Sequence, residues 1–90
     1  MNDRESIQQA LRLYVDENCL YMRRGVVVGD DESLLTRGVI DSLGVVELVA
    51  FVEERWNISV DAAEIVEANF GTFNAITRFV LGRIDQLAAG

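Results

Sequence analysis

The stretch from Gly38 to Trp56, GVIDSLGVVELVAFVEERW, limits the possible folds more than any other part of the chain. Asp41 stands directly before its apolar run, where a carboxylate can accept the free N–H groups of a first helical turn and complement the helix dipole. The apolar residues recur at the spacing of one helix face, and they are Val45, Leu48, Val49, Val52 and Trp56. The pattern therefore predicts an amphipathic helix from Ser42 to about Trp56, buried along this face.

Ser42 falls in the first turn of this predicted helix, where backbone N–H groups have no partners within the helix. Those groups and the helix dipole both favour an anion, so Ser42 is a suitable attachment point for a phosphodiester. The alternative is an ordinary capping serine, which is the commoner role of an Asp-Ser pair ahead of a helix. The surrounding residues decide between the two interpretations.

Asp41-Ser42-Leu43 and its surroundings resemble the acyl carrier protein family, whose hallmark is Asp-Ser-Leu at the head of the second helix. Gly38-Val39-Ile40 precede the motif here, and Val46-Glu47-Leu48-Val49 follow it, with Glu53-Glu54 and Trp56 further along. The resemblance covers nearly the whole chain, from the first predicted helix to about residue 80.

The resemblance implies that Ser42 carries a covalent 4′-phosphopantetheine arm, whose thiol holds an acyl or aminoacyl group as a thioester. A phosphopantetheinyl transferase would transfer the arm from coenzyme A, with Asp41 helping that enzyme and its magnesium to position the serine. Leu43 completes the expected cofactor-binding residues. Partner enzymes that load and process the cargo are expected to have basic docking surfaces. By residue matching, the partner-binding face consists of Leu43, Val46, Glu47, Ala50 and Glu54.

A first helix is predicted over Met1–Met22, capped by Asn2 or Asp3. Its inward face consists of Ile7, Ala10, Leu11, Tyr14, Val15 and Cys19. The following segment, Arg23–Ile40, has no helical period, and we expect a long loop held by four apolar anchors. These anchors are Leu34, Leu35, Val39 and Ile40.

A third, short helix is predicted to start at the capping-box spacing Asp61–Glu64 and to end by Gly71, with Ile65 and Val66 packed inward. Thr72 can cap the last helix. The apolar stripe of that helix consists of Phe73, Ile76, Val80, Ile84 and Leu87.

These elements predict an all-α fold, a four-helix bundle of acyl-carrier type. Three helices are long, the third is short, and a long loop joins the first two. We expect residues 1–90 to form a single domain. Val26–Val28 has strand-like composition, but no second strand is in sight to pair with it, so we expect no β structure.

The chain has no histidine and no lysine, so the side chains that usually activate a serine nucleophile are missing. We therefore expect a carrier and not an enzyme. With no histidine and one cysteine, only carboxylate metal sites are possible. The acidic triplet Asp30–Glu32 lacks ligand spacing and is typical of a solvated turn, so no metal site is expected.

The formal net charge is −7, which disfavours nucleic acid and anionic membranes and favours basic partners. The longest apolar run, Leu48–Val52, is too short to span a bilayer, and the N-terminal residues lack signal-peptide features. The single cysteine, Cys19, is expected in the core and fits a reducing compartment. We expect a cytoplasmic monomer without membrane insertion.

Two residues depart from family members that serve fatty-acid synthesis. Those members usually carry an acid directly after Asp-Ser-Leu, where this chain has Gly44, and their second helix has a run of three acids, which here ends at Arg55. Both departures favour a dedicated polyketide, aminoacyl or modified-lipid pathway.

We therefore expect a carrier of acyl thioesters in a fatty-acid, polyketide or related specialised pathway. One alternative is a stand-alone peptidyl carrier with aminoacyl cargo, and another is an unmodified helical protein-interaction domain. The acyl assignment is preferred to the peptidyl one because Val39-Ile40-Asp41-Ser42 lacks the Gly-Gly-His/Asp-Ser motif of many peptidyl carriers.

Overall fold

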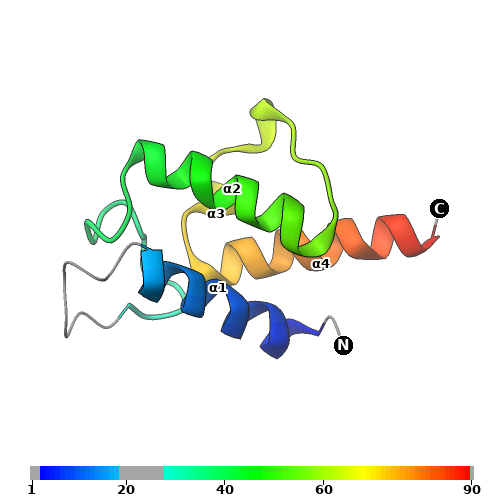
Figure 1. The fold of residues 1–90 in the computed structure, drawn as a ribbon, viewed down its shortest axis with the longest axis horizontal. Helices are drawn as coiled ribbons and strands as arrows, with labels where there is room; N and C mark the ends of the chain where they lie inside the picture. The colour runs from blue at the N-terminus through cyan, green and yellow to red at the C-terminus, as the bar shows by residue number, and fades with distance from the viewer. Residues whose placement is uncertain (1–2, 19–27, 90) are drawn as a thin grey trace.

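A computed structural model describes residues 3–18 and 28–89, and within these ranges the chain is helical with no strand. The helices are α1 (Arg4–Asn18), α2 (Ser42–Trp56), α3 (Glu67–Phe70) and α4 (Phe73–Ala89), with one 3₁₀ turn, η1, at Ala62–Glu64. In Figure 1, α1 runs in the opposite direction to α2 and α4. Helix α4 contacts α1, α2 and α3. The predicted all-α bundle with three long helices and a short third one is confirmed.

Helix α1 begins at Arg4 because the Asp3 carboxylate accepts the N–H of Ser6 at 2.8 Å and caps the first turn. The expected start at Met1 is therefore too early, and the expected end at Met22 lies outside the described residues, as does Cys19. The predicted inward face is otherwise confirmed. Ile7, Leu11 and Val15 are buried, and Ala10 and Tyr14 pack against them half-buried.

Helix α2 has the predicted bounds and the predicted buried face. Leu48, Val49, Val52 and Trp56 are buried, and Val45 packs against them half-buried. The helix ends at Asn57, whose backbone is left-handed with φ 54° and ψ 51°. The N–H groups of Asn57 and Ile58 both donate to the carbonyl oxygen of Glu53, and the Glu53 carboxylate accepts the N–H of Val60 at 2.9 Å. Glu53 thus directs the chain out of the helix.

The predicted single helix from Asp61 to Gly71 is wrong, because the chain leaves the helical conformation at Ile65 (φ −85°, ψ 76°) and is extended at Val66 (φ −130°, ψ 161°), between η1 and α3. The Glu64 carboxylate bonds back to the Asp61 N–H at 3.0 Å and pairs with Arg83 of α4, so η1 ends after one turn. Ile65 is half-buried, but Val66 is 47% exposed and does not pack inward as expected. A β-branched residue such as valine accepts the extended backbone readily.

Helix α4 is capped as predicted, since the Thr72 hydroxyl oxygen accepts the N–H of Ala75 at 3.0 Å. Phe73, Ile76 and Val80 are buried and Ile84 is half-buried. Leu87 is 61% exposed, so its predicted place in the core is wrong. Figure 1 shows the reason: the last turns of α4 project beyond the ends of α1 and α2.

The described part of the first loop, residues 28–40, is tied to the far end of the chain. The Leu34 N–H donates to the Gly71 carbonyl at 2.9 Å, and the Asn74 N–H donates to the Asp30 carbonyl at 3.0 Å. Leu34, Val39 and Ile40 are buried as expected, but the fourth expected anchor, Leu35, is 44% exposed. A turn of helical hydrogen bonds over residues 33–38 rotates Leu35 away from its buried neighbour Leu34.

Each carboxylate of the acidic triplet has its own partner. Asp30 pairs with Arg12, Asp31 accepts the side-chain amide of Asn74 at 2.9 Å, and Glu32 accepts the Gly29 N–H at 2.6 Å. No group of three potential metal ligands occurs among the described residues. Within the same ranges, no helix is long and apolar enough to cross a membrane.

Candidate functional site

Ser42 is the first residue of α2, and Asp41 caps the helix in front of it. The Asp41 backbone is extended, with φ −105° and ψ −176°, and its Oδ1 accepts the N–H of Gly44 at 2.7 Å. The Asp41 carbonyl accepts the N–H of Val45 at 3.0 Å, which closes the first helical turn. Both bonds are made by one residue, so Asp41 fixes the direction in which α2 leaves the loop.

The Ser42 side chain lies on the surface and is exposed, as are Asp41 and Leu43. Within residues 3–18 and 28–89, its hydroxyl has no hydrogen-bond partner, and no acceptor reaches the N–H groups of Ser42 and Leu43. Those N–H groups lie at the positive end of α2, where an anion is stabilised. The site therefore offers an accessible hydroxyl beside free backbone donors.

The segment in front of the site is held by a Schellman motif. The Gly38 N–H donates to the Leu35 carbonyl and the Val39 N–H to the Leu34 carbonyl, each at 3.0 Å. Gly38 has φ 71°, the left-handed conformation that this motif requires. Because the Leu34 N–H also bonds to Gly71, the approach to Ser42 is fixed to the junction between α3 and α4.

The expected partner face lies on the exposed side of α2. Leu43 and Val46 are 67% and 57% exposed. Glu47, Ala50 and Glu54 are exposed as well, and their spacing places all five residues on one stripe below Ser42.

Leu35 and Val66 are also exposed, and sequence reasoning missed this because it placed both in the core. With Val45, Ile65, Glu67 and Phe70 they line a small hollow of about 80 Å³ between the first loop, α2 and α3. Their exposure depends on how the loop and α3 pack against α2, which no local pattern reports. The hollow lies next to the first turn of α2, which carries Ser42.

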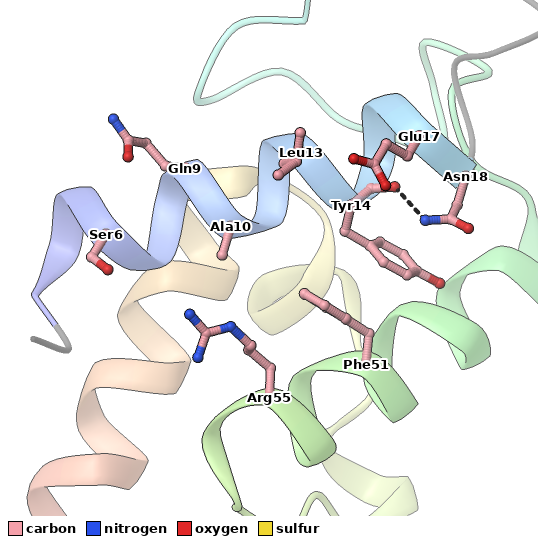
Figure 2. Close-up of a pocket in the computed structure, with 9 residues that line it drawn as sticks. All are labelled: Ser6, Gln9, Ala10, Leu13, Tyr14, Glu17, Asn18, Phe51 and Arg55. Atoms are coloured by element: carbon pink, nitrogen blue, oxygen red, sulfur yellow. Dashed lines mark hydrogen bonds between the residues drawn. The ribbon is translucent and has the colours of Figure 1, made fainter.

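A larger cleft of about 430 Å³ separates α1 from α2 (Figure 2). Phe51 and Arg55 reach from α2 toward α1, and Phe51 stacks on Tyr14 with ring centroids 4.3 Å apart. Phe51 is nine positions after Ser42, which places them about 180° apart around the helix axis at about 100° per residue. This cleft therefore does not open onto Ser42.

The fold and the exposed serine at a capped helix head are those expected of a carrier protein. No protein-family model matches the chain. It is similar to the D-alanyl carrier protein of Streptococcus suis (strain 98HAH33), with 46% identity over 46 residues, which cover 51% of this chain and 58% of the relative. The protein of the same name from Streptococcus sanguinis (strain SK36) is 40% identical over 50 residues, which cover 56% of this chain and 63% of the relative.

A third D-alanyl carrier protein, from Streptococcus equi subsp. zooepidemicus (strain MGCS10565), is 44% identical over 46 residues, which cover 51% of this chain and 58% of the relative. The chain thus spans less than two thirds of the length of the curated relatives it matches. These matches confirm the resemblance to carrier proteins. The relatives are named as carriers and not as catalysts.

Proposed function

We propose that this chain is a single carrier domain whose Ser42 accepts 4′-phosphopantetheine from a phosphopantetheinyl transferase. The observation that carries the proposal is the exposed Ser42 hydroxyl, without a partner among the described residues, at the capped head of α2. Attachment forms an Oγ–P bond and breaks the pyrophosphate bond of coenzyme A. The hydroxyl proton leaves to solvent and adenosine 3′,5′-bisphosphate departs.

The residues around Ser42 fit this group. The free N–H groups of Ser42 and Leu43 and the dipole of α2 favour the phosphodiester anion. The exposed Asp41 carboxylate stands beside the hydroxyl in the chain, where a transferase and its magnesium can use it. When attached, the arm supplies the thiol that holds the cargo as a thioester.

The cargo that we propose is an aminoacyl group, so that the chain acts as a peptidyl-type carrier. The similar proteins are named D-alanyl carrier proteins, which supports this alternative over the acyl cargo preferred from the sequence. The hollow beside the first turn of α2 measures about 80 Å³. A protein cavity that holds benzene measures about 150 Å³. The hollow therefore suits a small side chain better than a long acyl chain, and fatty-acid and polyketide pathways become the second candidate.

The partners that we propose are the transferase and the enzymes that load and unload the cargo. Their contact surface would combine the apolar Leu43 and Val46 with the acidic Glu47 and Glu54, and Ala50 lies between them. Such a surface fits a partner with an apolar centre and a basic rim. We propose that the carrier meets these partners as a monomer.

Intact-mass measurement tests the modification directly. The protein is incubated with coenzyme A, magnesium and a broad-specificity phosphopantetheinyl transferase. We expect the wild type and Ser59→Ala, a control at another exposed serine, to gain the mass of one arm, and Ser42→Ala to gain none while remaining folded. A wild type that gains no mass would overturn the carrier function in favour of an unmodified interaction domain. A Ser42→Ala variant that still gains the arm would move the site elsewhere.

A further inference from the structure

Gly44 lies in the first turn of α2 with its α-carbon against the side chain of Ile40. A Cβ atom added at Gly44 would lie 2.5 Å from Cγ1 and 3.4 Å from Cδ1 of Ile40, and 3.2 Å from Oδ1 of Asp41. The first of these distances is shorter than any ordinary contact between carbon atoms. Any residue other than glycine would therefore have to displace Ile40, Asp41 or the helix turn itself.

Ile40 is held in place from several sides. Its side chain is buried in the core, and its N–H points to the Leu34 carbonyl at 3.4 Å. The preceding residue, Val39, is buried and bonded to the same carbonyl at 3.0 Å. The core around Ile40 is close-packed, so a shift of its Cγ1 needs a shift of its neighbours.

Ile40, Asp41 and Gly44 flank Ser42 in the chain and lie against one another. Asp41 follows Ile40 in the chain, and its carboxylate accepts the N–H of Gly44 at 2.7 Å. We call these three residues the cap cluster. A displacement of Ile40 would move the backbone of Asp41, and with it the bond that fixes the first turn. Ser42 lies between the two ends of that bond, so its position depends on all three residues.

Glycine is an unfavourable residue inside a helix, because it loses more backbone freedom on folding than alanine does. Gly82 shows the contrast: it lies in α4 and has no atom within 4 Å of an added Cβ. Gly82 can thus accept a side chain, and Gly44 cannot. Local helix preference therefore does not explain Gly44, whereas the contact with Ile40 does.

We propose that Gly44 is a positioning residue for Ser42: the missing side chain lets buried Ile40 pack beneath the first turn while Asp41 caps it, and this holds the Ser42 hydroxyl where the transferase needs it. The inference rests on the proposed function for the identity of the reaction. The geometry of the cap cluster does not depend on it. The experiment therefore has two parts, one that tests loading and one that tests the geometry.

The loading experiment compares transferase kinetics of the wild type, Gly44→Ala and the matched control Gly82→Ala. It is run at a temperature where circular dichroism shows all three to be folded. We expect Gly82→Ala to load like the wild type. Gly44→Ala should lose about tenfold in kcat, with a smaller change in KM, because a displaced hydroxyl lowers the rate in the bound complex. Equal kcat values for Gly44→Ala and Gly82→Ala would overturn the positioning role.

Substitutions at Ile40 sharpen the test, since they separate the close contact with Cγ1 from the ordinary contact with Cδ1. Ile40→Ala removes both Cγ1 and Cδ1, so the double variant Ile40→Ala/Gly44→Ala should recover most of the lost kcat although its core is smaller. Ile40→Val keeps a Cγ1 atom, so Ile40→Val/Gly44→Ala should stay slow. Recovery in both double variants, or in neither, would contradict the role assigned to Cγ1.

The second experiment, hydrogen exchange, needs no transferase. Amide hydrogen exchange at residue 44 reports the bond to Asp41, and we expect protection to fall about tenfold in Gly44→Ala and to return in Ile40→Ala/Gly44→Ala. Unchanged protection in Gly44→Ala would overturn the cap cluster. If the wild type accepts no phosphopantetheine, the proposed function fails. The exchange measurement still decides whether the cap cluster has the geometry described.

Discussion

Tyr14 of α1 and Phe51 of α2 stack with their ring centroids 4.3 Å apart and their planes inclined by 19°. Both residues line the cleft in Figure 2, and Phe51 also makes a T-shaped contact with Trp56, with ring centroids 5.9 Å apart. It therefore links the first helix to the helix that carries Ser42.

A double-mutant cycle with Tyr14→Leu and Phe51→Leu should give a coupling free energy of about 0.5–1.5 kcal/mol, because stacked rings contribute this much beyond the area they bury. Urea unfolding of the wild type, both single variants and the double variant gives the four free energies. Effects that add within about 0.3 kcal/mol would show that the two rings do not interact.

Gly38→Ala should destabilise the fold by roughly 1–2 kcal/mol, because alanine at φ 71° brings its Cβ close to the following carbonyl. The matched control is Gly82→Ala, which should stabilise the protein by about 0.5–1 kcal/mol, since alanine is the better helix residue and has open space there. Urea midpoints measure both. Shifts in the same direction for the two variants would contradict the left-handed conformation of Gly38.

Glu64→Gln should lower the melting temperature near neutral pH and leave it almost unchanged in acid. The Asp61 N–H, and secondarily Arg83, lower the pKa of Glu64 from its ordinary value of 4.5, so the carboxylate is stabilised in the folded state. A depressed folded pKa contributes stability above the unfolded pKa, and that contribution is lost as pH falls through the folded pKa.

Melting curves of the wild type and Glu64→Gln between pH 3 and pH 7 check this expectation. The gap should be widest above about pH 5 and should narrow toward pH 3. Asp85→Asn serves as the control for the loss of one negative charge, since Asp85 is exposed. A difference in melting temperature that widens toward acid would contradict the assigned direction of the Glu64 pKa shift.

The small hollow beside the first turn of α2 predicts how stability depends on cargo length. A transferase that accepts acyl-coenzyme A substrates can attach arms loaded with two to eight carbons. We expect the melting temperature to level off after the first few carbons, because a hollow of about 80 Å³ has no room for more. A gain in unfolding free energy that continued at about 0.8 kcal/mol per CH₂ would show that the chain is enclosed and would favour an acyl carrier.

Reversing two charges on the partner face tests how partners approach. Glu47→Lys/Glu54→Lys should slow arm loading several-fold at low salt and make it nearly independent of salt, because exposed rim charges act chiefly on the association rate. The control, Glu5→Lys/Asp85→Lys, makes the same charge change at exposed positions on α1 and α4. Equal rates for the wild type and the α2 variant at low salt would assign recognition to Leu43 and Val46.

The start of α2, its cap and its buried face could be predicted from the sequence because their determinants are local. An acid before an apolar period of 3.6 residues fixed the start of α2, and both the cap at Asp41 and the burial of Leu48 and Val52 followed from that pattern. The break at Ile65 could not be predicted, because it depends on Arg83 pairing with Glu64 from a distant helix. The exposure of Leu35 has the same kind of cause, since the turn over residues 33–38 is oriented by its bond to Gly71.

The bond between Leu34 and Gly71 also bears on how the protein is made. A chain is synthesised from its N-terminus, so Ser42 leaves the ribosome before Gly71 and Asn74, two of the residues to which the loop in front of it is bonded. The Asp41 cap can form early because its partners are three and four residues away, but the loop cannot settle until α4 is present. If Ser42 is modified as proposed, a nascent chain would expose the Asp-Ser-Leu sequence before the loop in front of it is bonded in place, and a transferase that recognises the folded surface would act only after Gly71 and Asn74 are synthesised.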